Sequence, residues 1–201
     1  MLFERAAEGL AGEILQVGTV AVLFAFALLT LPLGVPILAP PAMAEYAHTL
    51  GVEAAVRTNT GETLVLPQDY ADMLGWEEQV ATVARVYHTL PDEQRRDAVV
   101  VAGNYGEAGA LDFCGPRYGL PEVVSPAGSY WFFGPGDRPG KVVITIGVPE
   151  DDLRRSFDSV ATAATVSHAW AVPEERSLTV HVGTRPRTTL QRLWPSLAGR
   201  N

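Results

Sequence analysis

The sequence is poor in the residues that build disulfides and metal sites. It has a single cysteine, Cys114, so an internal disulfide is excluded, and we expect this thiol to be buried and inert. The histidines at 48, 88, 168 and 181 are scattered, and none has a second ligand nearby in the sequence. A metal site is therefore not expected.

Signatures of several enzyme classes are also missing. The patterns G-x-S-x-G, Walker A, H-E-x-x-H and C-x-x-C do not occur, and no histidine lies near Cys114 in the sequence. A formal net charge of -8 argues against a general nucleic-acid binder. The soluble part therefore does not resemble a self-sufficient enzyme, and we assign it no catalytic residue and no cofactor.

Charged residues are absent from Ile14 through Ala44. The first part of this segment, up to Leu31, is dense in Leu, Val, Phe and Ala, and about 18 to 20 helical residues span a hydrocarbon core of roughly 30 Å. Pro32 and Gly34 follow, where such a helix would leave the bilayer. We predict one transmembrane helix over residues 14–33, preceded by a cytoplasmic segment, residues 1–13.

A cleaved signal peptide is the alternative for the same segment. Ala42-Met43-Ala44 fits the small-residue cleavage pattern. Three glutamates stand against the single Arg5 before the apolar stretch, whereas a signal peptide carries net positive charge there. Both interpretations place the remainder outside the cytoplasm when the N-terminus is inside. We favour the uncleaved helix, which predicts a single-pass protein of the cell membrane.

Residues 34–66 are rich in Pro, Ala, Thr and Gly and are expected to form a linker. Within this linker we predict a short helix from about Pro41 to Leu50 and a loop through Asn59-Thr60-Gly61. Residues 67–201 then form the extracytoplasmic domain.

Helical and strand patterns alternate along this domain. Apolar side chains recur on one face from Trp76 to Leu90, where Pro91 stops the helix. Further helices are expected over about Glu107–Gly115, after Pro149, and over Thr189–Leu197. Short apolar or β-branched segments predict five strands, at Ala98–Ala102, Glu122–Ser125, Lys141–Ile146, Val160–Val166 and Leu178–Val182. This alternation predicts an α/β fold, a three-layer sandwich with a mostly parallel sheet.

Polar side chains gather directly after the first predicted strand, where α/β proteins place ligand groups. Asn104, Tyr105 and Glu107 supply an amide, a phenol and a carboxylate, which suit a hydroxyl-rich ligand better than a phosphate. The glycines around them have the spacing G-x-x-G-x-x-G, an imperfect match to the dinucleotide fingerprint. Glu107 would occupy the helix terminus that a pyrophosphate needs. The alternative is that Glu107 only caps the helix.

Two further features lie nearby. Asp112 and Arg117 are expected to form an ion pair around the helix end. The aromatic run from Tyr130 to Phe133 cannot all face inward on one element, so one or two of its rings are expected to line a cleft or to meet the membrane interface. We count Trp131 among the candidate ligand-binding residues for this reason.

Taken together, these residues resemble the C-terminal end of glycosyltransferase family 39 proteins, the multi-spanning bacterial relatives of protein mannosyltransferases and of the aminoarabinose transferase that modifies lipid A. Order and spacing agree across nearly the whole chain. The stretches that carry the resemblance are Leu33–Pro41, Leu66–Asp72, Gly75–Glu78, Asn104–Ala110, Gly115–Pro121 and Leu193–Pro195.

The resemblance implies a last membrane helix that leads into an extracytoplasmic α/β domain. It also implies transfer of a hexose-type sugar from a polyprenyl-phosphate carrier, using acidic residues in the first external loop of the membrane region. This chain has one predicted span and lacks that loop, so no catalytic residue is carried over and its status as an enzyme stays open. The residues expected to contact a ligand are Asn104, Tyr105, Glu107, Arg117, Tyr118 and Trp131.

Three functions remain as alternatives. The first is a membrane-anchored domain that belongs or is accessory to a glycosyltransferase, with the bilayer, the transferase or its lipid-linked sugar as partners and no nucleic acid. The second is a stand-alone carbohydrate- or glycolipid-binding module at the membrane surface. The third is an independent, nucleotide-using α/β enzyme. Met1 is either a true start or the point where a longer reading frame was cut.

Overall fold

A computed structural model describes residues 9–52 and 63–198. The chain divides into two units, with the boundary between Ala71 and Asp72. The loop predicted through Asn59-Thr60-Gly61 lies outside the described residues. Each unit is described by itself below.

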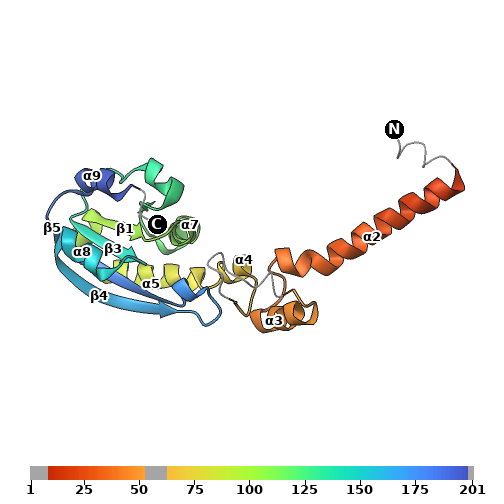
Figure 1. Ribbon diagram of the computed structural model, residues 1–201. Helices are drawn as coiled ribbons and strands as arrows, with labels where there is room; N and C mark the ends of the chain where they lie inside the picture. Colours follow the sequence, from red (N-terminus) through yellow and green to blue (C-terminus); the bar gives the residue numbers. More distant parts are fainter. Residues whose placement is uncertain (1–8, 53–62, 199–201) are drawn as a thin grey trace. The chain divides into compact units, whose positions relative to one another are not determined.

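The first unit begins with α2, Leu10–Gly34, a helix of 25 residues (Figure 1). Its large apolar side chains are exposed along its length, with no polar face, so it is not the core helix of a soluble domain. Within the described residues one segment, Gly12–Gly34, is long and apolar enough to cross a membrane. At 1.5 Å per residue it extends for about 34 Å, slightly more than a hydrocarbon core of about 30 Å.

Two shorter helices complete this unit. The predicted helix near Pro41 to Leu50 is confirmed as α3, Pro40–Thr49, with Pro40 at its first position. A single turn, α4, spans Gln68–Ala71. Tyrosine hydroxyls link these helices to the apolar segment, because Tyr46 donates to the carbonyl of Leu29 and Tyr70 to that of Leu38.

The second unit opens with α5, Trp76–Thr89. Its apolar residues recur every three or four positions, which buries Val80 and Val83 completely. Leu90 is extended because Pro91 follows it, and the helix ends there as predicted. A short helix, α6 at Asp92–Asp97, leads into the first strand.

Five strands form one sheet in the order β2-β1-β3-β5-β4 (Figure 1). β1 runs parallel to both of its neighbours, whereas β5 runs antiparallel to both β3 and β4. The bounds are β1 Ala98–Ala102, β2 Val123–Val124, β3 Val142–Ile146, β4 Phe157–Ser167 and β5 Ser177–Pro186.

The α/β class is confirmed, but the sheet is mixed and not mostly parallel, and the three-layer sandwich is not confirmed. The cause is the connection between β4 and β5. It contains no α-helix, only a short 3-10 turn, η4 at Pro173–Glu175. Parallel neighbours need a crossover of a dozen or more residues, usually a helix, so this shorter connection produces an antiparallel hairpin instead.

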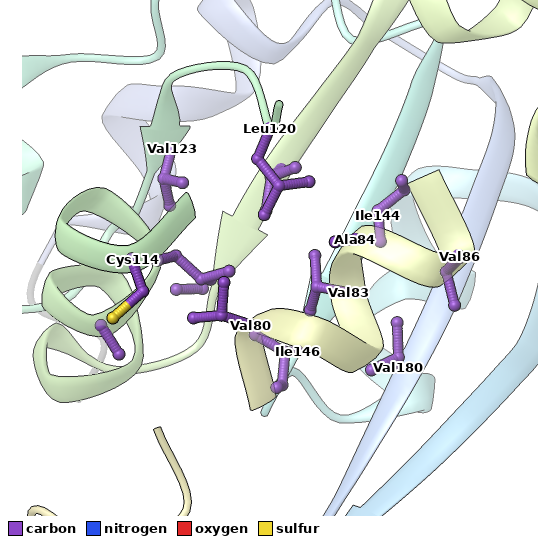
Figure 2. Close-up of a cluster of buried hydrophobic side chains, with 14 of the residues drawn as sticks. Val80, Val83, Ala84, Val86, Cys114, Leu120, Val123, Ile144, Ile146 and Val180 are labelled. Atoms are coloured by element: carbon purple, nitrogen blue, oxygen red, sulfur yellow. The ribbon is translucent and has the colours of Figure 1, made fainter. Parts of the chain in front are cut away.

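Hydrophobic side chains pack on both faces of the sheet. On one face α5 and α7, Tyr105–Cys114, cover Val100, Ile144 and Val180, as Figure 2 shows for part of this cluster. On the other face Val99 and Val143 meet α8, Glu150–Ser156, and α9, Leu190–Leu193. The chain closes with η5, Trp194–Leu197, which buries Trp194 on the same face.

Candidate functional site

The carboxyl ends of β1 and β3 lie side by side, because these two strands are parallel neighbours. β1 continues through Gly103 and Asn104 into α7, which packs on one face of the sheet, while β3 continues through Gly147 into α8 on the other face. The two connections therefore diverge at this edge. In α/β proteins a crevice at such a divergence is the usual place for a ligand.

Asn104 and Glu107 form a capping box at the start of α7. The Asn104 side chain accepts a hydrogen bond from the Glu107 amide at 2.7 Å. The Glu107 carboxylate accepts in return from the amides of Gly103, at 2.9 Å, and Asn104, at 3.2 Å. The interpretation of Glu107 as a helix cap is confirmed, and the exchange fixes the turn between β1 and α7.

Glu107 is also almost fully buried, with 2% of its surface exposed. Its carboxylate lies against Gly147, where an added Cβ would come within 2.1 Å of Oε1. Gly103 is equally constrained, since its Cβ would come within 2.4 Å of the Gly147 carbonyl oxygen. The close approach of the β1 and β3 ends to this carboxylate therefore requires glycine at both positions.

Burial raises the pKa of Glu107 from 4.5 to about 7, against the two backbone hydrogen bonds, which lower it. The negative charge of Glu175 adds to the rise. Glu175 itself accepts from the side chains of Asn104, at 3.1 Å, and Gln79, at 3.3 Å. Desolvation also raises the pKa of Glu175. Two carboxyl groups linked through Asn104 thus share an environment that disfavours charge.

A pocket of about 340 Å³ opens beside this turn. Its walls come from the ends of β1 and β3 and from α8, α9 and η5, and most of the side chains that line it are apolar. The lining residues are Val101, Gly103, Asn104, Pro126, Val143, Thr145, Gly147, Val148, Pro149, Asp152, Leu153, Ser156, Phe157, Leu190, Leu193 and Leu197.

Thr145 is the unusual member of this lining. It lies next to the carboxyl end of β3 and is 1% exposed, and its hydroxyl has no hydrogen-bond partner among the described residues. His181 pairs with Thr145 across β3 and β5, and its buried Nδ1 likewise has no partner within the described chain. Buried polar groups without partners are rare in folded proteins, so each one needs an explanation.

The structure brings two of the six expected ligand-binding residues together at this turn, and one of them lines the pocket. Asn104 and Glu107 meet in the capping box, and Asn104 reaches the pocket wall. Tyr105 points into solvent and is 70% exposed. Trp131 packs instead against Trp194, each indole NH donating to the other's carbonyl at 3.2 and 3.0 Å.

Arg117 and Tyr118 form a separate surface cluster with Glu77 of α5. Tyr118 donates to Glu77 at 3.1 Å, and Arg117 lies 3.5 Å from the same carboxylate. The ion pair expected between Asp112 and Arg117 is therefore wrong. Asp112 accepts instead from the Tyr130 hydroxyl at 3.0 Å. Glu77 is forty positions from Arg117, so short-range sequence spacing could not predict this pair.

The aromatic run falls on a 3-10 helix, η3, Gly128–Phe133. Trp131 is half-buried there, whereas Phe132 and Phe133 are each 80% exposed. The prediction that the four rings cannot all face inward is confirmed. The thiol of Cys114 is buried, also as predicted.

Sequence reasoning did not identify Thr145, Gln79 or Glu175 as members of the site. Thr145 did carry a signal, because it is the one polar residue inside an otherwise apolar strand, β3. Gln79 and Glu175 carried none, since each reaches the site only through tertiary packing. Within the described residues no group of His, Cys, Asp and Glu is arranged to hold a metal ion.

The fold and site define an α/β domain with a ligand-sized pocket at the point where its strand connections diverge. Comparisons with protein-family models, with curated proteins and with solved structures find no match for this chain.

Proposed function

We propose that this chain is a membrane-anchored, extracytoplasmic ligand-binding domain that belongs to, or serves, a glycosyltransferase using a polyprenyl-phosphate-linked sugar. The observation that carries the proposal is the pocket at the β1 and β3 ends. The turn that borders it, Gly103–Asn104, leads into Asn104–Ala110, one of the stretches that carry the resemblance to glycosyltransferase family 39. Binding and not catalysis is the role that this geometry supports.

The lining of the pocket supports assigning the transfer chemistry to another polypeptide or another segment. Within the described part of the lining the one carboxylate, Asp152, accepts from Arg155 of the same helix at 2.6 Å. The buried carboxyl of Glu107 accepts two backbone hydrogen bonds that hold it to the α7 terminus. Neither arrangement offers a pair of carboxylates facing one substrate across the pocket, the arrangement that most glycoside hydrolases use.

The apolar helix supports the anchoring part of the proposal. Gly12–Gly34 is long enough to cross a bilayer once, which would keep the α/β unit at a membrane surface where lipid-linked sugars are used. The extracytoplasmic side follows from the resemblance. Protease added outside intact cells should degrade an epitope placed after Ala198, and protection of that epitope would contradict the proposed side.

Co-purification tests the association with a transferase. The full chain, tagged after residue 201, is extracted with a mild detergent from membranes of its native host, and a multi-spanning membrane protein should accompany it. A control chain keeps residues 1–71 and carries an unrelated soluble domain in place of residues 72–201. Recovery of the same partner with the control, or of none with the full chain, would contradict the proposal.

A stand-alone glycolipid-binding module is the second candidate. The pocket favours it, because about 340 Å³ is a volume typical of small-molecule sites. Under this alternative the full chain binds its ligand but recovers no membrane partner.

A further inference from the structure

We infer that the pocket beside β1 and β3 binds a hydrocarbon segment that ends in an uncharged hydrogen-bonding group, such as an alcohol or the linking oxygen of an alkyl glycoside. This inference rests on the proposed ligand-binding function and specifies its substrate class. Three properties of the pocket carry it: the apolar walls, one unpartnered hydroxyl at its floor, and the lack of a cation among the described residues that line it.

The walls are hydrocarbon on both sides. Val101 and Val143 form the floor on the sheet, while Leu153 of α8 and Leu190 and Leu193 of α9 cover it. An apolar cavity of about 150 Å³ accommodates one benzene molecule, so a pocket of about 340 Å³ has room for roughly ten to thirteen carbon atoms. Burial of a hydrocarbon chain against these side chains needs no polar compensation.

The floor presents one unsatisfied polar group. The Thr145 hydroxyl is 1% exposed and has no hydrogen-bond partner among the described residues, although it lines the pocket. A ligand atom that donates to or accepts from this hydroxyl would supply the missing partner. The polar end of the ligand therefore lies deep, against β3.

The other polar side chains in the lining are largely engaged. Asn104 bonds the Glu107 amide and the Glu175 carboxylate, and Asp152 accepts from Arg155. The hydroxyl of Ser156, a half-buried lining residue, is the second one available. A free sugar carries a hydroxyl on nearly every carbon, and each would need a partner once buried. Two hydroxyls cannot supply them, so the pocket suits a chain better than a sugar ring.

The charges in the pocket lining disfavour a ligand whose end group is anionic. Among the described residues no Lys, Arg or His lines the pocket, and the one ionisable side chain in that lining is the acidic Asp152. A carboxylate or phosphate moved into this lining would lose its hydration without gaining a counter-ion. The end group that faces Thr145 is therefore neutral.

Photo-crosslinking of the full chain in phosphatidylcholine nanodiscs tests the inference. The probe is decanol with a diazirine on its chain, compared with decanoic acid and glucose that carry the same group. We expect the alcohol to label peptides that contain Leu153 or Leu190–Leu193, and excess unlabelled decanol to remove this labelling. Probe dissolved in the bilayer labels residues 12–34 instead, and adducts confined to that helix would overturn the inference. Equal or stronger labelling of the pocket by the acid or by glucose would also overturn it.

Two variants make the test specific to the pocket. Thr145→Val keeps the shape but removes the hydroxyl, so the concentration of decanol that halves labelling should rise roughly three- to tenfold. The same change removes an unpartnered buried group, so the melting temperature without ligand should not fall. Thr162→Val is the matched control, because Thr162 faces the same side of the sheet from β4 but does not line the pocket.

A second variant, which fills the pocket with a larger side chain, keeps the test valid if Thr145→Val perturbs the core. Ser156 lies half-buried at the end of α8, so Ser156→Leu should fold and should abolish pocket labelling by occupying the volume. Unchanged labelling in both variants would overturn the inference. Failure of the glycosyltransferase proposal gives a different result, because loss of the membrane partner leaves the labelling of Leu153 and Leu190–Leu193 intact.

Discussion

Glu107 combines two properties that usually exclude each other. It caps a helix by accepting two backbone hydrogen bonds, which favours its charged form, and it is buried against glycine, which favours its neutral form. Burial is the stronger effect, and the pKa of Glu107 rises to about 7. Its protonation therefore changes within the physiological range of pH.

This shift predicts a stability that falls as pH rises. Between 4.5 and about 7 the folded protein keeps a proton on Glu107 that the unfolded chain has released. The free energy of unfolding should decrease by about 3 kcal/mol over this interval and level off above it. Glu175, whose pKa is also raised by burial, acts in the same direction. Urea unfolding of the full chain in nanodiscs, followed by tryptophan fluorescence across pH 4 to 9, measures the slope.

Glu107→Gln should flatten most of this slope, since the amide oxygen still accepts from the backbone but no proton is exchanged. Glu93→Gln, at an exposed position on α6, is the control and should leave the profile unchanged. A Glu107→Gln profile as steep as that of the unmodified chain would show that another group carries the pH dependence.

The surroundings of Gly147 predict how much one added methyl group lowers the free energy of unfolding. Its φ is +68° and a Cβ would lie 2.1 Å from the Glu107 carboxylate, which itself is held by α7. Gly147→Ala should lower the free energy of unfolding by about 3 kcal/mol or more, combining backbone strain with overpacking. Gly119→Ala isolates the strain, because its φ is +70° but the nearest atom lies 3.8 Å away. It should cost about 1 kcal/mol. Equal losses in the two variants would refute the close approach.

The start of helix α7 is held by one residue, Asn104, whose side chain makes two hydrogen bonds to different parts of the chain. Asn104 caps the helix through Oδ1 and holds Glu175 through Nδ2. Asn104→Ala should reduce the free energy of unfolding by about 2 kcal/mol, because it removes the cap and leaves Glu175 with one partner fewer. Asn104→Ser keeps a capping oxygen and loses only the link to Glu175, so it should cost about half as much by urea unfolding. Identical losses would mean that the cap contributes nothing.

The helices were predictable because their signals are local. The apolar recurrence from Trp76 to Leu90 and the stop at Pro91 are properties of adjacent residues, and α5 follows them closely. The strand β3 is visible as a β-branched segment between two glycines, and its bounds differ from the predicted ones by one residue. Elements with local signals of this kind keep their predicted bounds in the folded protein, because the tertiary contacts favour the same secondary structure.

Strand direction was not predictable in the same way. In the sequence β4 follows a helix, which predicted a parallel neighbour. Within the described residues it pairs with β5 alone, and that pairing is antiparallel. The missing helix between Ser167 and Ser177 was the available signal, and it indicated a hairpin. Pattern alternation along a chain does not specify which strands become neighbours.

The sequence predicted only those parts of the site whose residues are close together in the chain. Asn104 and Glu107 stand three residues apart at a strand–helix turn, and their capping relation can be read from that spacing. The pocket itself combines β1, the adjacent β3 and α8, and α9, and tens of residues separate β1 from β3 and α8 from α9. Its lining therefore could not be deduced from spacing. Arg117 shows the same limit, since its carboxylate partner lies on α5.

The size of the protein in native membranes distinguishes three interpretations of the apolar segment: an anchor, a cleaved signal peptide, or the last span of a longer transferase. An antibody against residues 72–198 should detect a band near 21.6 kDa in native membranes if the chain is a stand-alone anchored protein. Cleavage after Ala44 would give a shorter, soluble band and would contradict the anchor. A band several times larger would identify the chain as the tail of a complete transferase. An immunoblot of separated membrane and soluble fractions makes the measurement.

The sheet order also sets when the domain can be completed during synthesis. β5 is the last strand to be made, yet it lies inside the sheet between β3 and β4. Until Pro186 has left the ribosome, β3 has one open edge and β4 has no neighbour at all. Nascent chains that stall before Ser177 therefore expose strand edges that can pair with other chains. We therefore expect delayed completion of translation to favour aggregation of this protein.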